Sequence, residues 1–228
     1  MIMSEAKKKS IFNLANSLTV SRVILGFVFL ALFLIQNMGN LDTQASLIVN
    51  IVAFFVFVIA IITDALDGYV ARKTGTVTDF GKHFDPLADS IFFVIVFGTF
   101  VYLGLMPWYL FLIVIIREGY MHIYLRPHLR RNGIMLPANI YGKTKTFCQC
   151  MFSLIILFMM ILRQILILTS ILSDDNAALF QNVINITAFV LFCIIAFLSA
   201  MSLLIYIVQN AAKMKEIRQS QSNQNESK

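Results

Sequence analysis

Carboxylates are concentrated between positions 64 and 89 of this 228-residue chain. The segments on either side of this stretch are long, apolar and almost uncharged. A carboxylate in such surroundings carries a desolvation penalty that a purely structural role rarely justifies. The five aspartates of the stretch are Asp64, Asp67, Asp79, Asp85 and Asp89. Asp79 is expected to be a solvated loop residue, so four carboxylates remain as candidates for chemistry.

These four candidates form two pairs, each of which would lie on one face of a helix. Asp64 and Asp67 are three residues apart, and Asp85 and Asp89 are four residues apart. Both spacings are those of neighbours on a helix surface. Pro86 suits the first position of a helix, so Asp85 is expected to be the N-cap. The short segment between the pairs would let the two helix ends meet.

Carboxylates that converge on one place repel one another unless cations lie among them. Hard oxygen ligands, with no His or Cys at ligand spacing, indicate Mg²⁺, Mn²⁺ or Ca²⁺ rather than zinc. Such an ion can polarise a phosphoryl group. Near the first pair, Gly68 and Ala71 leave room for a nucleotide or phosphate, and Arg72 offers a forked donor to phosphate oxygens. The stretch therefore predicts a metal-dependent site that handles phosphates.

The composition indicates which elements must position these residues. The chain is 59% hydrophobic and 13% charged, with a mean hydropathy of +0.80, whereas soluble domains carry roughly a quarter charged residues. We therefore expect an all-α integral membrane protein, with six transmembrane helices around a polar active site. The expected spans are Leu18–Ile35, Ala45–Ile62, Ile91–Leu105, Pro107–Leu125, Phe147–Leu172 and Val183–Val208.

The lysines and arginines predict how the chain crosses the bilayer. Outside the spans they lie in the N-terminal segment, in the connections 72–82 and 126–145, and after position 210, while the other connections hold none. Because cytoplasmic segments are enriched in these residues, both termini and the aspartates are expected to face the cytoplasm. The net charge of +6 reflects this asymmetry, and no basic and aromatic interleaving indicates nucleic-acid binding.

The same pattern divides the chain into three parts. Residues 1–16 are expected to be a cytoplasmic N-terminal segment, and residues 17–210 a six-helix catalytic domain. Residues 211–228 would form a polar cytoplasmic tail. The last ten of these residues, 219–228, are expected to be disordered because they are uniformly polar.

Basic residues near the fourth and fifth spans form a second group of candidates. Arg117 lies about ten residues inside its span, a depth at which a charge usually faces a cavity or a partner. Adjacent residues on a helix point apart, so an ion pair with Glu118 is not expected. Lys143 and Lys145 open the fifth span, where their charge opposes the helix dipole and suggests a bound anion. With Arg126, they would form a basic pocket that suits a phosphate-bearing substrate.

The stretch from Asp64 to Asp89 resembles the signature of the CDP-alcohol phosphotransferase family, D-x2-D-G-x2-A-R-x8-G-x3-D-x3-D, at every fixed position. The resemblance implies an enzyme that transfers a substituted phosphate from a CDP-linked donor to an alcohol and releases CMP. It also implies two divalent ions, Mg²⁺ or Mn²⁺, and a homodimer in the lipid bilayer.

The resemblance further implies roles for individual residues. The metal ligands would be Asp64, Asp67, Asp85 and Asp89. The residues that hold the CDP part of the donor would be Asp64, Gly68, Ala71 and Arg72. Asp89 would also be the general base that takes the proton of the acceptor hydroxyl.

Two further segments resemble the bacterial phosphatidylglycerophosphate synthase branch of the family. They are an R-E pair followed by G-K-x-K-T-x2-Q from Gly142 to Gln149, and V-T-D-F-G-K-x-x-D-P-L-A-D directly before Ser90. The implied donor is CDP-diacylglycerol, the implied acceptor is sn-glycerol 3-phosphate, and the implied location is the bacterial cytoplasmic membrane. Ser90 itself departs from the branch, in which lysine is common at this position.

Three alternatives remain open. Serine, inositol phosphate or phosphatidylglycerol as the acceptor would leave the core reaction unchanged. An ion or proton transporter would use intramembrane carboxylates as a relay, but its acidic residues belong near the bilayer midplane, whereas these four lie at predicted helix ends. A lipid-binding scaffold with basic loops would leave the aspartate spacing unexplained.

Overall fold

The structure, a computed structural model, describes residues 14–39, 41–74, 81–131 and 140–226. All regular secondary structure in these ranges is helical, which confirms the predicted all-α class. The elements are α1 (Leu14–Met38), α2 (Thr43–Thr74), α3 (Gly81–Tyr102), α4 (Trp108–Gly119), η1 (Tyr120–Leu125), α5 (Arg126–Arg131), α6 (Ile140–Leu168) and α7 (Asp174–Glu226).

Five of the described helical stretches are long and apolar enough to cross a membrane. They are Val20–Met38, Thr43–Asp64, Trp108–His128, Gly142–Leu168 and Asn176–Ala211. The apolar part of α3, Pro86–Tyr102, is shorter, because the first turn of that helix is polar. At 1.5 Å per residue it extends about 26 Å. The described residues thus contain five candidate spans and one shorter apolar helix, where the sequence predicts six spans.

Two predicted helix ends are wrong. Helix α3 begins at Gly81, so Pro86 lies inside it and Asp85 is not the N-cap. A proline so close to a helix start has a suitable φ and removes only one hydrogen bond. Helix α7 continues to Glu226, so residues 219–226 are helical rather than disordered. Extending a formed helix needs no new nucleation step.

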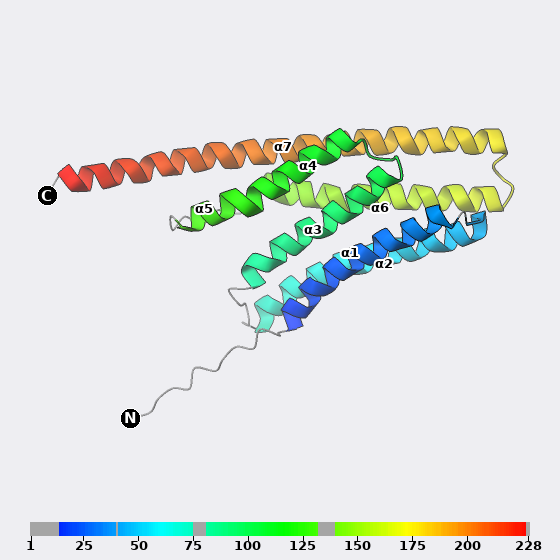
Figure 1. The fold of residues 1–228 in the computed structure, drawn as a ribbon, viewed down its shortest axis with the longest axis horizontal. Helices are drawn as coiled ribbons and strands as arrows, with labels where there is room; N and C mark the ends of the chain where they lie inside the picture. The colour runs from blue at the N-terminus through cyan, green and yellow to red at the C-terminus, as the bar shows by residue number, and fades with distance from the viewer. Residues whose placement is uncertain (1–13, 40, 75–80, 132–139, 227–228) are drawn as a thin grey trace, which may run out of the picture.

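The helices form an elongated bundle (Figure 1). Helix α1 packs on α2 and α3, α2 also contacts α6, and α7 packs on both α6 and α4. The turns α1–α2, α3–α4 and α6–α7 lie at one end of the bundle, and the start of α1 and the end of α7 lie at the other. Asp64, late in α2, and Asp89, early in α3, therefore share that second end.

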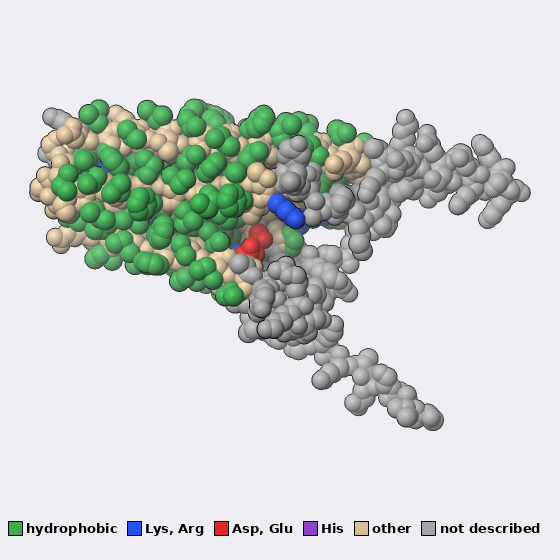
Figure 2. All heavy atoms as spheres, turned by 180° about the vertical axis from the view of Figure 1, so that it is seen from behind, with side chains coloured by type: hydrophobic (Ala, Val, Ile, Leu, Met, Phe, Trp, Pro, Cys, Tyr) green, Lys and Arg blue, Asp and Glu red, His purple; other side chains and the backbone are tan. Residues whose placement is uncertain are grey.

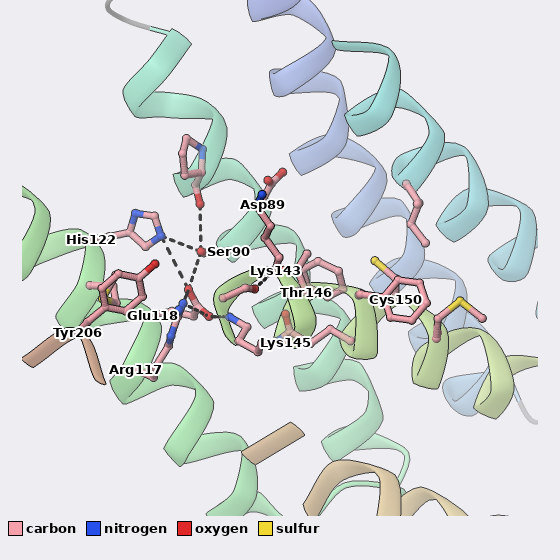
Figure 3. Close-up of a pocket in the computed structure, with 18 of the residues that line it drawn as sticks. Asp89, Ser90, Arg117, Glu118, His122, Lys143, Lys145, Thr146, Cys150 and Tyr206 are labelled. Atoms are coloured by element: carbon pink, nitrogen blue, oxygen red, sulfur yellow. Dashed lines mark hydrogen bonds and ion pairs between the residues drawn. The ribbon is translucent and has the colours of Figure 1, made fainter. Parts of the chain in front are cut away.

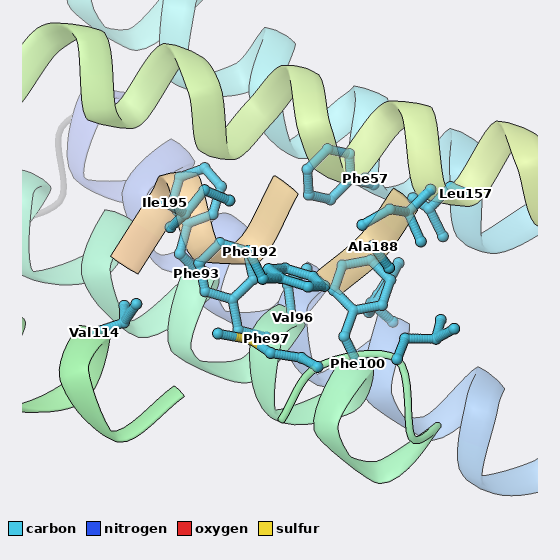
Figure 4. Close-up of a cluster of buried hydrophobic side chains, with 14 of the residues drawn as sticks. Phe57, Phe93, Val96, Phe97, Phe100, Val114, Leu157, Ala188, Phe192 and Ile195 are labelled. Atoms are coloured by element: carbon cyan, nitrogen blue, oxygen red, sulfur yellow. The ribbon is translucent and has the colours of Figure 1, made fainter. Parts of the chain in front are cut away.

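Phenylalanine rings fill the centre of the bundle (Figure 4). Phe57 of α2 stacks on Phe92 of α3 with ring centroids 5.6 Å apart. Phe97 and Phe100 of α3 each lie 5.6 Å from Phe192 of α7. Such aromatic pairs add to the stabilisation from buried area. This core fixes α3 against α2 and α7, and so fixes the helix that carries Asp89.

The outer surface of the bundle is apolar. Large hydrophobic side chains are exposed on every long helix, and Figure 2 shows them covering most of one face. Acidic and basic side chains appear together on that face near one end of the apolar body. An apolar surface of this extent suits lipid rather than water, so the charged end is where polar chemistry can take place.

Candidate active site

One arginine joins Asp64 and Asp89, the two of the four candidate aspartates whose side chains are described. Arg22 of α1 is 2% exposed, and its Nη2 lies 3.0 Å from Asp64 Oδ1. Its Nη1 donates a hydrogen bond to Asp89 Oδ1. The three residues, called here the aspartate cluster, bring α1, α2 and α3 together at the charged end of the bundle. The Asp64 side chain is 51% exposed and that of Asp89 is 33% exposed, so both carboxylates remain accessible.

The donor set of the aspartate cluster fits a hard divalent cation. Two carboxylates from different helices converge on a single positive group, and carboxylate oxygens are the ligands that Mg²⁺ and Mn²⁺ prefer. Asp67 and Asp85 lie on α2 and α3, but their side chains are outside the described residues. Among the described side chains, no group of three His, Cys, Asp or Glu residues could hold a metal. The predicted four-carboxylate site therefore stays a prediction.

The side chains predicted to bind the CDP part of the donor are also outside the described residues, apart from Asp64. Gly68, Ala71 and Arg72 lie in the last turns of α2, and their side-chain environments are outside the described residues. Their backbone is helical, as the sequence predicts for the segment that follows Asp64.

A second cluster surrounds the buried Glu118, which is 6% exposed (Figure 3). Arg117 Nη1 donates to both Glu118 carboxylate oxygens at 2.9 Å, and Lys145 Nζ donates to Oε1. Ser90 Oγ donates to Oε2 at 2.8 Å. These residues and His122 are called here the glutamate cluster. A buried carboxylate is tolerated when it is paired and hydrogen-bonded in this way.

The Arg117–Glu118 pair corrects the expectation that neighbouring residues could not pair. Both side chains are long and flexible, and both line the same cavity, so their ends meet although their Cβ atoms diverge. The Arg117 Nη2 also donates to Ser202 Oγ of α7 at 3.2 Å. The guanidinium is thus held from two helices.

The π-helical segment η1 keeps three residues aligned toward the site. Glu118, His122 and Arg126 are four residues apart, and all three line one cavity. In a regular α-helix of 3.6 residues per turn, each step of four residues rotates a side chain by about 40°. The wider π turn, with its i→i+5 bonding, reduces this drift. The π segment between α4 and α5 therefore helps to keep the three side chains on the cavity.

Ser90 connects the glutamate cluster to that helix face. His122 Nε2 lies 2.8 Å from Ser90 Oγ, and Arg126 Nη1 lies 3.4 Å from His122 Nδ1. A hydroxyl has one proton, so when Ser90 donates to Glu118 it must accept from His122 Nε2–H. Nδ1 is then the acceptor for Arg126. The serine that departs from the expected lysine thus has specific partners.

A cavity of about 660 Å³ joins these groups. Its lining includes Asp89 of α3 and the four predicted basic residues, Arg117, Arg126, Lys143 and Lys145. The basic pocket beside Asp89 is therefore present in the structure. Asp64 lines a smaller adjoining cavity with Arg22 and Asp89. Among the described residues that line the larger cavity, four cations face two carboxylates, and one of these, Asp89, is already paired with Arg22.

Sequence reasoning missed several of these residues. Arg22 and Glu118 are charges inside apolar helices, and that signal alone could have selected them. Ser202 and Tyr206 of α7 carry no such signal, yet Ser202 holds Arg117 and Tyr206 lines the cavity.

The sequence model of the CDP-alcohol phosphatidyltransferase family matches residues 12–174. This chain belongs to that family, as the aspartate spacing indicated. The match covers α1 to α6, so α7 adds its side chains to the cavity from outside the matched region.

Several bacterial proteins are similar to this chain over 60% to 64% of its length. A CDP-diacylglycerol–glycerol-3-phosphate 3-phosphatidyltransferase of Bacillus subtilis is 35% identical over 141 residues, 60% of this chain and 72% of that protein. A probable phosphatidylglycerophosphate synthase of Mycobacterium tuberculosis is 36% identical over 144 residues, 63% of this chain and 65% of that protein. A Rickettsia typhi protein with the same name as the Bacillus one is 36% identical over 147 residues, 64% of this chain and 76% of that protein.

Proposed function

We propose that the protein transfers a phosphatidyl group from CDP-diacylglycerol to a hydroxyl of sn-glycerol 3-phosphate and releases CMP. Family membership supports the transfer of a substituted phosphate, and the names of the relatives support this donor and acceptor. The observation that carries the acceptor is the cavity, which places an excess of cationic side chains beside Asp89. A phosphorylated alcohol would supply the balancing charge, whereas neutral serine would not.

In the proposed reaction Asp89 is the general base. Its carboxylate takes the proton from the acceptor hydroxyl, and the hydroxyl oxygen attacks the phosphorus of the phosphatidyl group. The bond between that phosphorus and the oxygen bridging to CMP breaks, and CMP leaves with the bridging oxygen. A carboxylate within hydrogen-bond reach is needed because an alcohol is a poor nucleophile near neutral pH. The exposure of Asp89 and its place in the cavity support this role.

Asp64, Asp67, Asp85 and Asp89 would hold two divalent ions, Mg²⁺ or Mn²⁺. The ions would offset the charge of the donor diphosphate and polarise the phosphoryl group. Arg22 supports this assignment, because it shows that two of the four carboxylates already converge on a positive group. Gly68, Ala71 and Arg72, together with Asp64, would hold the CDP part of the donor.

The acceptor phosphate would bind Arg117, Arg126, Lys143 and Lys145. Lys143 is exposed, so it would meet the phosphate at the cavity entrance. Lys145 and Arg117 are buried and would contact it from inside. Glu118 positions these two cations without neutralising the set.

We further propose that residues 17–210 form a catalytic domain of six transmembrane helices, flanked by the segments 1–16 and 211–228. Both chain ends and the active site would face the cytoplasm, because the lysines and arginines accumulate on that side. The protein would work in the bacterial cytoplasmic membrane as a homodimer, as the family resemblance implies.

The test supplies the purified protein with CDP-diacylglycerol, Mg²⁺ or Mn²⁺, and one acceptor at a time, and follows CMP release. The acceptors are sn-glycerol 3-phosphate, serine, inositol phosphate and phosphatidylglycerol. We expect metal-dependent release of CMP that is fastest with sn-glycerol 3-phosphate. A faster rate with serine or inositol phosphate would remove the proposed acceptor and leave the family assignment intact.

A further inference from the structure

Two residues that line the large cavity each carry a buried hydrogen-bond donor with no partner among the described residues. The donors are Arg117 Nε and Gln149 Nε2. Both residues line the cavity, and Gln149 is 1% exposed and Arg117 8%. Buried polar groups are almost always hydrogen-bonded. A ligand in the cavity that brings two acceptor atoms would supply the missing partners.

The two donors differ in charge and so favour different acceptor groups. Arg117 belongs to the cationic set, which suits phosphate oxygens. Gln149 carries an uncharged amide, one helical turn beyond Lys145 on α6. With cations available for the phosphate, the amide is the group that matches an uncharged oxygen. A hydroxyl is such an oxygen.

The proposed acceptor has two hydroxyl groups. In sn-glycerol 3-phosphate the hydroxyl at C1 reacts, and the hydroxyl at C2 stays unchanged. The reacting hydroxyl must reach Asp89 on α3, whereas Gln149 lies on α6. The amide is therefore available for the hydroxyl at C2.

We infer that Gln149 is a specificity-determining residue that donates a hydrogen bond from its amide to the non-reacting hydroxyl of the acceptor. This inference rests on the proposed function, since it assumes a phosphorylated polyol in the cavity. An acceptor without that hydroxyl would leave the buried amide unpaired, and such a site rejects the analogue.

A second buried glutamine on α6, Gln164, has a structural role and serves as a comparison for Gln149. Gln164 is also buried, at 8% exposure, but its Oε1 accepts a hydrogen bond of 2.7 Å from Asn50 Nδ2 of α2. The protein itself satisfies this oxygen, and Gln164 is not among the residues that line the cavity. Gln164→Leu is therefore a matched control for Gln149→Leu, in the same helix and with the same change of side chain.

The experiment compares sn-glycerol 3-phosphate with 3-hydroxypropyl phosphate, which keeps the phosphate and the primary hydroxyl but lacks the hydroxyl at C2. The ratio of the two kcat/KM values is measured on one preparation, so it does not depend on how much protein is folded. For the unmodified protein we expect a ratio of about ten or more, the effect of one buried hydrogen bond. Gln149→Leu should bring the ratio to within about threefold of one, chiefly by slowing sn-glycerol 3-phosphate.

Gln149→Met, which keeps the length of the side chain, should repeat the result, and Gln164→Leu should retain the original ratio. Equal losses for both acceptors in the Gln149 variants would mean a structural role and would overturn the inference. A ratio near one in the unmodified protein would overturn it as well. If neither phosphorylated acceptor reacts while serine does, the proposed function itself fails, which is a different outcome.

Discussion

The aspartate cluster and the glutamate cluster are neighbours with opposite charge balance. In the aspartate cluster, two carboxylates share the single cation of Arg22. In the glutamate cluster, one carboxylate holds both Arg117 and Lys145, and Arg126 and Lys143 line the same cavity. The first region attracts cations and the second attracts anions. A divalent ion and a phosphorylated acceptor would each supply what one region lacks.

The two regions also differ in exposure. Asp64 and Asp89 are partly exposed, whereas Glu118, Arg117 and Lys145 are buried. Buried charges hold a fixed geometry because an unpaired one is costly, and exposed carboxylates can exchange partners. Burial and pairing thus constrain the side chains of the glutamate cluster, whereas the carboxylates of the aspartate cluster are open to other partners.

The largest expected effect comes from Asp89, which lines the cavities of both regions. Asp89→Asn removes the proposed general base, so turnover should fall by about 10² to 10⁴. The measurement is CMP release with CDP-diacylglycerol, metal and sn-glycerol 3-phosphate. Asp42→Asn is the control, because the Asp42 carboxylate caps the start of α2 through Ala45 N, at the other end of the bundle. Near-normal turnover of Asp89→Asn would exclude the proposed base.

The next effect concerns the rigidity of the glutamate cluster. Glu118→Gln leaves Lys145 and Arg117 without their buried counter-charge, which should lower the free energy of unfolding by about 3 kcal/mol. Denaturation of the detergent-solubilised protein measures it. The double variant Glu118→Gln with Lys145→Met should recover part of the loss, since both members of one pair are then uncharged. Additive losses would show that the two side chains do not act as a pair.

A smaller effect is expected in the aspartate cluster. Arg22→Met leaves two partly exposed carboxylates to repel each other, so the free energy of unfolding should fall by about 2 kcal/mol without metal. Mn²⁺ should then raise Tm more in the variant than in the unmodified protein, because metal no longer competes with a guanidinium. An equal rise in Tm for both proteins would mean that the Arg22 guanidinium does not occupy the place of the metal ion.

The fold was largely predictable because the signals are local. Long apolar segments predict the helices, and five of the described stretches are long and apolar enough to cross a membrane. The side on which each connection lies stays a prediction. The helix ends were less predictable. Pro86 suggested a helix start but lies inside α3, five residues after Gly81. A proline is most common in the first turn of a helix, but its presence does not fix the residue at which the helix begins.

The site residues could be selected from the sequence only where a local signal marks them. The carboxylate pairs stand at helical spacing, Arg117 is a charge deep inside an apolar span, and Lys143 and Lys145 lie at the start of a helix. Arg22 lies 67 residues from Asp89, and Lys145 lies 27 from Glu118, so only the packing of helices brings them together. The role of Ser202 depends on α7 reaching Arg117, and no local pattern predicts that contact.

The central claim is that the basic cavity binds the phosphate of the acceptor, and separate KM values for the two substrates test it most directly. Lys143→Gln and Arg126→Gln should each raise the KM for sn-glycerol 3-phosphate about tenfold, the effect of one charged hydrogen bond. The KM for CDP-diacylglycerol should stay unchanged. Arg163→Gln is the matched control, because Arg163 donates to the Ala177 carbonyl and does not line the cavity. An unchanged KM for the acceptor, or an equal rise for the donor, would contradict the account.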